Sequence, residues 1–254
     1  MSERLSEKEA SVKGALAKPD EMEVIYLSRC ASTMDEAKAS LAHSEIPFVL
    51  FCDEQTDGRG RNGNEWEDTP KGIAGTFVLE AFDSHNECLG LSLVIGLSVA
   101  RALKRSGVAV QLKWPNDLLD ADGNKVGGIL VELEERGGKV VPLIGLGLNI
   151  EDGPSGVAGA SGLRVDREFL GFAAEIVNEL WGDMKLFKQS GFAHFQSEFS
   201  QFGAFIGEEI ALESDGETFS GVFAGVNTDG ALLLRNNTRK GREFYSAQNI
   251  RKIS

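Results

Sequence analysis

The chain has 254 residues, enough for one large domain or for one domain with a small appended module, and its hydrophobic fraction of 42% is typical of globular proteins. A net charge of −13 argues against a protein whose main partner is nucleic acid, because such affinity depends on lysines and arginines that neutralise phosphates. Three cysteines are too few and too irregularly spaced for a disulfide framework or a zinc site.

The N-terminal region, residues 1–21, is polar and lacks strong periodicity, so we expect a loose arm or a short helix. It also lacks the apolar core of a secretory signal. The longest apolar stretch of the chain, residues 89–102, is interrupted by glycine and serine and is predicted to be part of a packed helix. We therefore expect a cytoplasmic protein without a membrane span.

Residues 22–203 are predicted to form one domain of strands and helices. Short apolar runs predict strands, and longer runs with apolar residues at helical spacing predict helices. Two apolar runs on either side of a turn at residues 135–138 predict a hairpin at the heart of a sheet. The predicted strands are 23–27, 48–52, 73–80, 110–113, 126–133 and 140–150. The predicted helices are 33–42, 86–105, 166–187 and 192–202.

After residue 203 the pattern changes to short apolar runs separated by turns. This spacing predicts a small β-barrel domain over residues 204–254. The predicted strands there are 208–212, 218–226, 231–235 and 242–245. A local group of basic residues leaves a nucleic-acid-binding barrel open as an interpretation, although the acidic total disfavours it. The basic residues are Arg235, Arg239, Lys240, Arg242, Arg251 and Lys252.

A polar loop over residues 53–71 contains Gly-Arg-Gly-Arg-Asn-Gly at positions 58–63, which matches the glycine pattern of dinucleotide-binding sites. Such a site needs a helix that begins inside the motif, and here a proline and a glycine interrupt the stretch that follows. Glycines can turn backbone N–H groups toward an anion, and Arg59 and Arg61 offer donors suited to phosphate or carboxylate. The hexapeptide alone favours a plainer interpretation, an exposed turn with two solvated arginines.

Four segments together resemble the biotin–protein ligase family in their order and spacing. They are Ser-Thr-Met-Asp-Glu-Ala at 32–37, the loop at 53–66, Lys-Trp-Pro-Asn-Asp-Leu at 113–118 with Lys-Val-Gly-Gly-Ile-Leu at 125–130, and Gly-Leu-Gly-Leu-Asn at 145–149. The resemblance extends from about residue 24 to the end of the chain. It implies an α+β fold with a mixed central β-sheet flanked by helices, similar to class II aminoacyl-tRNA synthetases, and a small SH3-like β-barrel at the C-terminus.

By this resemblance the chain is an ATP-dependent ligase. It would activate biotin to biotinyl-5'-AMP, with ATP and Mg²⁺, and transfer the biotinyl group to a lysine of a biotin carboxyl carrier protein in a biotin-dependent carboxylase such as acetyl-CoA carboxylase. The resemblance also makes a homodimer through an edge of the central sheet plausible. Longer members of the family carry an N-terminal winged helix that represses transcription, and no DNA binding is expected for this chain.

The resemblance assigns the ureido ring of biotin to Ser32, Thr33 and Gln55, whose hydroxyl and amide groups can read one carbonyl and two N–H groups. Ser32 also precedes a predicted helix, with Asp35 at a capping-box-like spacing, and a helix cap is an open interpretation that is compatible with ring binding. Trp66 would wall off the biotin pocket, or else pack as ordinary core. The predicted biotin site also includes Gly58, Arg59, Gly60, Arg61, Lys125 and Gly128.

The loop at residues 58–66 would close over the acyl adenylate, with Arg59 and Arg61 near its phosphate. Glycine-rich and polar, the loop has little to pack against, so we expect it to become ordered on ligand binding. The family loop commonly carries more basic residues where this chain has Asn62 and Asn64. With two fewer positive charges, the tightness with which the adenylate is held stays open.

At the nucleotide end, Lys125 would contact the carboxylate of biotin and then the new acyl–phosphate bond. The resemblance assigns the phosphates and Mg²⁺ to Lys113, Asn116 and Asp117, and the adenine edge to Asn149. Asp117 could instead be a turn former, and the sequence fixes no other metal ligand. The predicted catalytic residues are Lys125, Arg61, Lys113 and Asp117.

Two other functions stay open. A lipoate–protein ligase resembles this family in its fold, but a dithiolane ring offers nothing for Gln55 and Thr33 to hydrogen-bond. A non-catalytic protein that binds biotin or its adenylate would retain the fold with a decayed site. The sequence has no Gly-x-Ser-x-Gly motif and no metal-binding histidine pair, so hydrolase and zinc-enzyme functions lack support.

Overall fold

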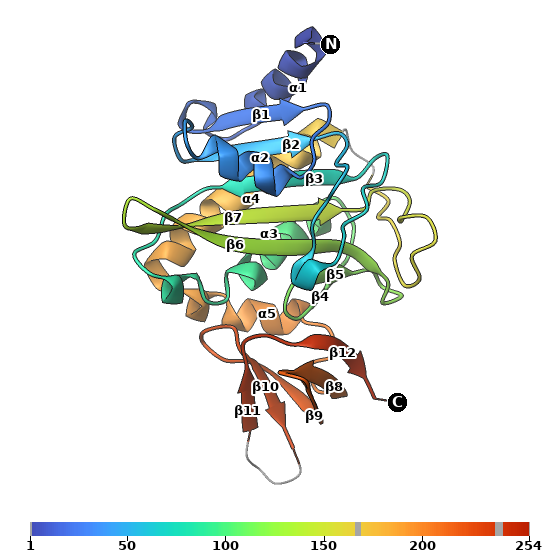
Figure 1. The fold of residues 1–254 in the computed structure, drawn as a ribbon. Helices are drawn as coiled ribbons and strands as arrows, with labels where there is room; N and C mark the ends of the chain where they lie inside the picture. Colours follow the sequence, from blue (N-terminus) through green and yellow to red (C-terminus); the bar gives the residue numbers. More distant parts are fainter. Residues whose placement is uncertain (1, 166–168, 237–240, 254) are drawn as a thin grey trace.

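A mixed sheet forms the larger part of the molecule in the computed structural model, which describes residues 2–165, 169–236 and 241–253 (Figure 1). Its order is β1-β2-β3-β7-β6-β5-β4, with β1 and β2 parallel and the other neighbours antiparallel. The strands are β1 (Glu23–Leu27), β2 (Phe48–Cys52), β3 (Ile73–Val78), β4 (Gln111–Lys113), β5 (Asp117–Leu119), β6 (Lys125–Arg136) and β7 (Lys139–Leu148).

Helices cover both faces of this sheet (Figure 1). The helix α2 packs on β2, β3 and β7, where Met34 and Leu41 meet Phe48 and Leu143 in a small core. The other face carries the larger core beneath α3 and α4, which also contact each other. The helices are α1 (Ser2–Gly14), α2 (Thr33–Ser40), α3 (Leu91–Arg105), α4 (Phe169–Ser190) and α5 (Gln196–Phe202), with short 3₁₀ turns at Pro19–Glu21, Arg61–Gly63, His85–Cys88 and Phe192–His194.

The predicted hairpin is the long pair β6 and β7, which runs through the middle of the sheet. Gly137 and Gly138 connect the strands with φ of 58° and 75°. A two-residue hairpin turn with both φ values positive matches the right-handed twist of the strands, and glycine adopts it without strain. The turn therefore fixes the register that brings Gly128 opposite Gly147 at the other end of the hairpin.

Of the two expectations for the N-terminal region, the helix is confirmed and the loose arm is wrong for residues 2–21. The helix α1 packs on β1 and α4, and Val12 in this helix is fully buried. The Glu9 carboxylate accepts a hydrogen bond of 3.0 Å from the backbone N–H of Tyr26 in the edge strand β1. The apolar pair Val12 and Leu16, at helical i, i+4 spacing, explains why this polar stretch docks on the domain.

Several predicted boundaries change in the structure. The helix predicted from residue 86 is a 3₁₀ turn followed by α3, because Gly90 adopts a left-handed φ of 80° between them. Asp117, for which a turn former was the alternative interpretation, is the first residue of β5. The predicted start of α4 at residue 166 lies outside the described residues.

The apolar helix α3 belongs to the interior. By length and composition the stretch His85–Arg105 could cross a membrane, but 61% of its apolar window is buried inside the protein. Eleven of the fifteen residues of α3 are buried. This agrees with the packed helix predicted for residues 89–102.

The C-terminal region forms an antiparallel sheet of order β11-β10-β9-β8-β12. Its strands are β8 (Glu209–Ser214), β9 (Glu217–Val226), β10 (Leu232–Arg235), β11 (Gly241–Phe244) and β12 (Gln248–Lys252), of which β12 was not predicted. Within the described residues β11 and β12 do not pair, so the predicted barrel is observed as an open sheet. Arg239 and Lys240 of the basic group lie outside the described residues.

The C-terminal sheet is joined to the large sheet next to β4. The indole N–H of buried Trp114 donates to the Gly230 carbonyl at 2.9 Å, and the Ala204 N–H donates to the Leu112 carbonyl at the same distance. These contacts bring the C-terminal strands beside the turn between β4 and β5. The turn carries part of the site described below.

Candidate active site

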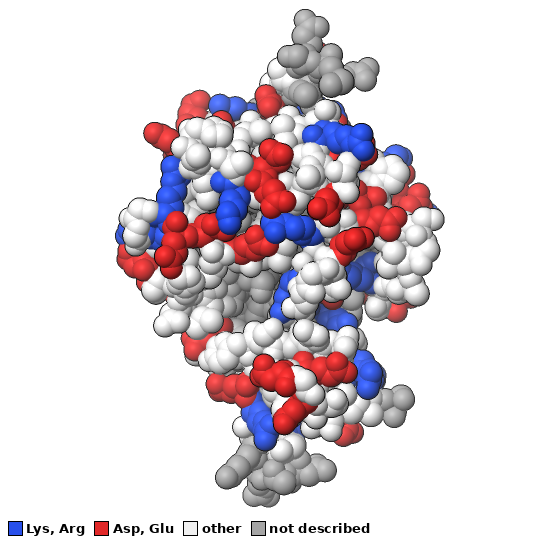
Figure 2. Space-filling model, in the orientation of Figure 1, with Lys and Arg blue, Asp and Glu red and all other residues white. Residues whose placement is uncertain are grey.

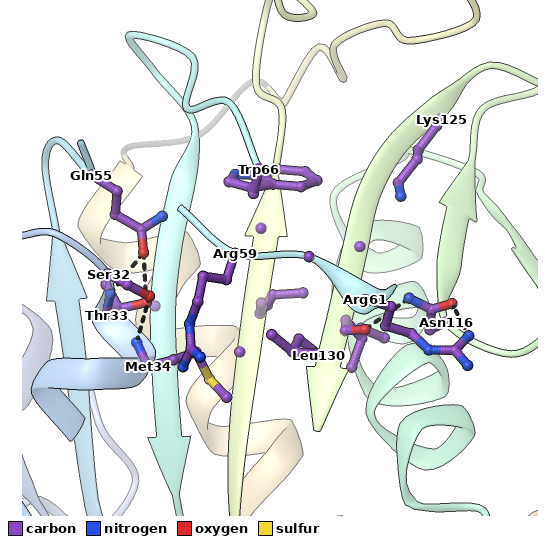
Figure 3. Close-up of a pocket in the computed structure, with 17 residues that line it drawn as sticks. Ser32, Thr33, Met34, Gln55, Arg59, Arg61, Trp66, Asn116, Lys125 and Leu130 are labelled. Atoms are coloured by element: carbon purple, nitrogen blue, oxygen red, sulfur yellow. Dashed lines mark hydrogen bonds between the residues drawn. The ribbon is translucent and has the colours of Figure 1, made fainter. Parts of the chain in front are cut away.

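A cavity of about 50 Å³ lies beneath the loop at residues 58–66, between the start of α2 and the strands β6 and β7 (Figure 3). Two open grooves, of about 650 and 430 Å³, share Gly60 and Arg61 with it. Together they form a continuous hollow that runs from α2 to the C-terminal sheet.

Three glycines form the floor of the cavity. Gly145 and Gly147 alternate along β7 and therefore face the same side of the sheet, and Gly128 pairs with Gly147 across β6. A Cβ atom on Gly147 would lie 2.3 Å from the ring of Trp66, and one on Gly145 would lie 2.9 Å from the sulfur of Met34. Glycine at these two positions leaves room for the Trp66 ring and the Met34 side chain, which line the cavity. Gly145 and Gly147 were not predicted as site residues, although glycine at every second position of a buried strand is a signal for such a close approach.

One end of the cavity presents hydroxyl and amide groups. Ser32 is fully buried, and its Oγ accepts from the Met34 N–H at 3.3 Å, so the helix-cap interpretation is confirmed. The backbone N–H and the hydroxyl of Thr33 donate to Gln55 Oε1 at 2.8 and 3.0 Å. The hydroxyl of Thr76 donates to Thr33 Oγ1 at 3.0 Å. The structure thus brings together the three residues predicted for a ureido ring (Figure 3).

Asp68 lies next to this polar end and was not predicted as a site residue. Its carboxylate accepts from the backbone N–H of Gln55 at 2.6 Å and from Gln55 Nε2 at 3.1 Å. Burial raises the pKa of Asp68, against the effect of the hydrogen bonds from Gln55 and Trp66. No spacing rule in the sequence connects residues 55 and 68, because the loop between them sets the contact.

Trp66 forms a wall of the cavity and lies directly against the glycine floor. Its ring is half-buried and lies over the β7 strand near Gly147 (Figure 3). The loop folds back on itself, with the Trp66 N–H donating to the Gly58 carbonyl at 2.8 Å and the Gly60 N–H donating to the Asn64 carbonyl at 2.7 Å. A Cβ on Gly58 would lie 2.4 Å from the Trp66 carbonyl oxygen, so this closed loop requires glycine there. Trp66 lines a cavity and is not ordinary core.

Arg59 and Arg61 point to different ends of the cavity (Figure 3). The Arg59 guanidinium reaches Asp35 at 2.9 Å and Glu132 at 3.2 Å, on α2 and β6. The structure therefore does not bring Arg59 to the same end as Arg61, as the sequence analysis expected for one phosphate. Two carboxylates explain this position, and Asp35, which was expected in a capping-box spacing, pairs with Arg59.

Arg61 lies at the other end. Its guanidinium donates to Asn116 Oδ1 and to Ser246 Oγ, both at 3.0 Å, and so links the loop to the β4–β5 turn and to the C-terminal region. Burial lowers the pKa of Arg61, and the negative charge of Asp117 only partly opposes this effect. A desolvated guanidinium that donates to these neutral groups suits an anionic ligand.

Lys125 and Asp117 form an ion pair with Nζ and Oδ1 2.6 Å apart. Both line the 430 Å³ groove together with Arg61, Lys113 and Asn116. The structure thus gathers all four predicted catalytic residues at this groove. Figure 2 shows basic side chains around the hollow between the two sheets, on a face where acidic side chains are numerous.

The groove offers little for a resident metal. Among the described residues no group of three or more His, Cys, Asp or Glu side chains could hold a metal ion. The carboxylates that line the groove are Glu65 and Asp117, and Asp117 is paired with Lys125. The donor set therefore fits a Mg²⁺ ion that is held mainly by the phosphates of a nucleotide.

Asn149 is the predicted site residue that the structure leaves away from the hollow. It is 2% exposed, its Nδ2 donates to the Ser161 carbonyl at 3.1 Å, and it lines none of the three cavities. Its Oδ1 is buried without a partner in the described part of the chain. The Asn149 side chain holds the loop that follows β7.

Comparisons with known proteins agree with this geometry. The profile of the Biotin/lipoate A/B protein ligase family matches residues 26–149, and the profile of the Biotin protein ligase C terminal domain matches residues 205–248. A biotin–[acetyl-CoA-carboxylase] ligase from Paracoccus denitrificans is 33% identical over 242 residues, which cover 88% of this chain and 98% of the relative. The chain belongs to the biotin–protein ligase family. The resemblance inferred from the four segments is confirmed.

Two further members of the biotin–protein ligase family allow the length and the fold of the chain to be compared. The bifunctional ligase/repressor BirA of Escherichia coli is 33% identical over 201 residues, and the chain spans 61% of its length. The biotin protein ligase of Aquifex aeolicus, solved in complex with biotin and ATP, superposes with a TM-score of 0.76 at 25% identity, over 91% of this chain and 99% of that one. The predicted α+β fold with a mixed central sheet is confirmed.

Proposed function

We propose that this chain is a biotin–protein ligase, which joins biotin and ATP to biotinyl-5'-AMP and transfers the biotinyl group to a lysine of a biotin carboxyl carrier protein. One observation carries the proposal. A single hollow has a neutral hydrogen-bonding end at Ser32, Thr33 and Gln55 and a cationic end at Arg61 and Lys125, and a glycine floor joins them.

The two ends match the two ends of biotin. A cyclic urea presents a carbonyl and two N–H groups, which hydroxyl and amide groups can pair. The apolar body of the ligand would lie between these two ends, beside the Trp66 ring. Its carboxylate would then reach the groove that Lys113, Lys125 and Arg61 line.

The chemistry has two steps. A carboxylate oxygen of biotin attacks the α-phosphorus of ATP, and pyrophosphate leaves with the electrons of the broken P–O bond. The amine of the carrier lysine then attacks the acyl carbon, loses a proton to solvent and releases AMP. Arg61, Lys113 and Lys125 would position the reactants and offset the crowding of negative charge, with Mg²⁺ arriving on the nucleotide phosphates.

The partner and the assembly are part of this proposal. Relatives named biotin–[acetyl-CoA-carboxylase] ligases suggest a carrier domain of that carboxylase as the acceptor. A homodimer through an edge of the sheet meets two obstacles, because Glu9 caps β1 and the Ala204 N–H occupies the Leu112 carbonyl of β4. We retain a cytoplasmic protein without DNA binding as the expectation from the sequence.

The alternative of a lipoate–protein ligase is weaker. The fold serves both acids, and the family profile carries both names. A dithiolane ring has no partner for the hydroxyls of Ser32 and Thr33 or for the Gln55 amide, and desolvating these groups without replacement hydrogen bonds costs about 1–3 kcal/mol each. A non-catalytic protein that binds biotin alone would not need the cations that surround the groove, and a protein that only binds the adenylate would not label a carrier domain.

The test is biotin-dependent exchange of labelled pyrophosphate into ATP, followed by transfer of labelled biotin to a purified carrier domain. We expect exchange with biotin and none above background with lipoate, then covalent labelling of the carrier. Exchange without labelling would retain the first step and remove the second. Exchange with lipoate alone would establish the lipoate ligase instead.

A further inference from the structure

The Gln55 side chain is held from both sides by groups of opposite hydrogen-bonding character. On one side the backbone N–H and the hydroxyl of Thr33 donate to Oε1 at 2.8 and 3.0 Å. On the other side the Asp68 carboxylate accepts from Nε2 at 3.1 Å and from the Gln55 backbone N–H at 2.6 Å. Thr33 and Gln55 line the cavity, whereas Asp68 lies behind Gln55 and lines none of the three spaces.

These contacts determine which way the amide faces. A backbone N–H can only donate, so the oxygen of Gln55 must face Thr33. An ionised carboxylate can only accept, so the nitrogen must face Asp68. An amide has two N–H donors, and Asp68 takes one of them. The second is left for a ligand that brings an acceptor, such as the carbonyl oxygen of a cyclic urea.

A carboxylate at the position of Asp68 is partly removed from water, which disfavours its charged form. It is half-buried, and burial raises its pKa, while Glu54 adds a further negative charge nearby. Among the described residues no lysine or arginine forms an ion pair with it, and the neutral backbone and amide N–H groups of Gln55 supply its hydrogen bonds. A half-buried carboxylate without a cation costs folding free energy, and such residues concentrate at functional sites.

We propose that Asp68 is a positioning residue that selects for a cyclic urea by fixing the orientation of the Gln55 amide. Trp66 is two residues from Asp68 and forms a wall of the same cavity, so Asp68 lies close both to this wall and to the polar end at Gln55. This inference rests on the proposed function, because it assumes that the ureido ring of biotin is the group that Gln55 reads.

The test is the affinity of the full chain for biotin and for lipoate, measured by calorimetry for the wild type, Asp68→Asn and Glu67→Gln. Asp68→Asn replaces one of the two accepting oxygens by an NH₂ group, so the side chain can no longer accept from both the backbone N–H and Nε2 of Gln55, and the orientation of the Gln55 side chain is released. Glu67→Gln removes one negative charge at the next position, where the exposed side chain lines none of the cavities. We expect biotin to bind at least about tenfold more weakly to Asp68→Asn, and within about twofold of wild type to Glu67→Gln.

A double-mutant cycle with Gln55→Ala separates positioning from a general loss of structure. If Asp68 acts through Gln55, the double variant binds biotin no more weakly than Gln55→Ala alone. Pyrophosphate exchange should show a raised KM for biotin with kcat within about twofold, because the cationic groove is unchanged. If Asp68→Asn does not fold, Asp68→Ser provides the same comparison with a smaller neutral side chain.

Two results would overturn the inference and leave the function intact. One is wild-type biotin affinity in Asp68→Asn, and the other is a loss in the double variant that equals the sum of the single losses. A wild-type protein that fails to bind biotin would instead contradict the proposed function itself. The two failures are therefore distinguishable within one set of titrations.

Discussion

Lys125 Nζ lies 2.6 Å from Asp117 Oδ1, and both side chains line the groove that also contains Arg61 and Lys113. The pair connects the first residue of β6 to the first residue of β5, so two neighbouring strands hold the ammonium group in place. The Lys125 ammonium group is paired with one carboxylate, Asp117, and can still bind the carboxylate of an incoming ligand.

Replacing Lys125 by Met should therefore slow the first half-reaction. Methionine keeps much of the length of the side chain and removes the charge, so the lost stabilisation is electrostatic. Removing one charge-stabilising donor typically lowers kcat by about 10²–10³. The measurement is biotin-dependent pyrophosphate exchange at saturating biotin and ATP.

Lys71→Met is the matched control. Lys71 is exposed and pairs with Glu151, away from the residues that line the hollow. Its exchange rate should remain within about twofold of wild type, because exposed ion pairs contribute about 1 kcal/mol or less. Equal rates in Lys125→Met and Lys71→Met would contradict the role of Lys125.

The two loop arginines should have separable effects. Arg61 faces neutral partners at the cationic end, so Arg61→Met should raise the KM for ATP and speed release of the acyl adenylate by about tenfold or more. Arg59 bridges Asp35 and Glu132 and is partly exposed, so Arg59→Met should mainly weaken biotin binding by loosening the closed loop, by about 1 kcal/mol or less. Filter retention of labelled adenylate measures the first effect and calorimetry the second. Identical profiles for the two variants would contradict this division of roles.

The sequence predicts the parts of this protein that depend on local pattern. The buried run of β2, the helix cap at Ser32 and the glycine turn at the end of β6 follow from residue spacing and backbone preference. The docking of α1 was missed because, among the residues whose side chains are described, its apolar anchors are few, namely Val12 and the following Leu16. Its polar contacts, from Glu9 to the backbone of β1 and from Lys8 to Asp53, join positions that sequence spacing does not connect.

Site residues divide in the same way. Thr33, Gln55, Arg61 and Lys125 lie in segments whose resemblance to a family could be recognised, and the fold brings them together. The direction of the Arg59 side chain depends on Asp35 and Glu132, which only the folded sheet places beside it. Asp68 reaches Gln55 through the path of an irregular loop, for which propensity and periodicity give no rule.

Gly147→Ala should close the floor of the cavity. The new Cβ would lie 2.3 Å from the Trp66 ring, a distance that forces the indole to move. We expect biotin affinity to fall by about tenfold or more, because the ring and the ligand compete for the same space, with a far-ultraviolet spectrum that is unchanged. Gly182→Ala is the matched control, since Gly182 is exposed on α4 with no atom within 4 Å of its Cβ position. A wild-type affinity in Gly147→Ala would show that Trp66 does not limit the pocket.

The pH dependence of the free energy of unfolding should show how much the partial burial of the Asp68 carboxylate destabilises the fold. Burial raises the pKa of Asp68 in the folded protein above the value of about 3.9 expected for an unfolded chain. Between these two values the native state binds more protons than the unfolded state, so the contribution of Asp68 to the free energy of unfolding falls as pH rises. Above the folded pKa the penalty is constant.

Asp68→Asn lacks this titration. The free energy of unfolding of the wild type minus that of Asp68→Asn should therefore decrease from about pH 4 upward and then level off, as measured by urea denaturation at intervals between about pH 4 and 7. Glu67→Gln provides the comparison for an exposed acid at the neighbouring position. A difference that grows with pH would mean that the hydrogen bonds from Gln55 outweigh burial, and that Asp68 stabilises the fold as a carboxylate.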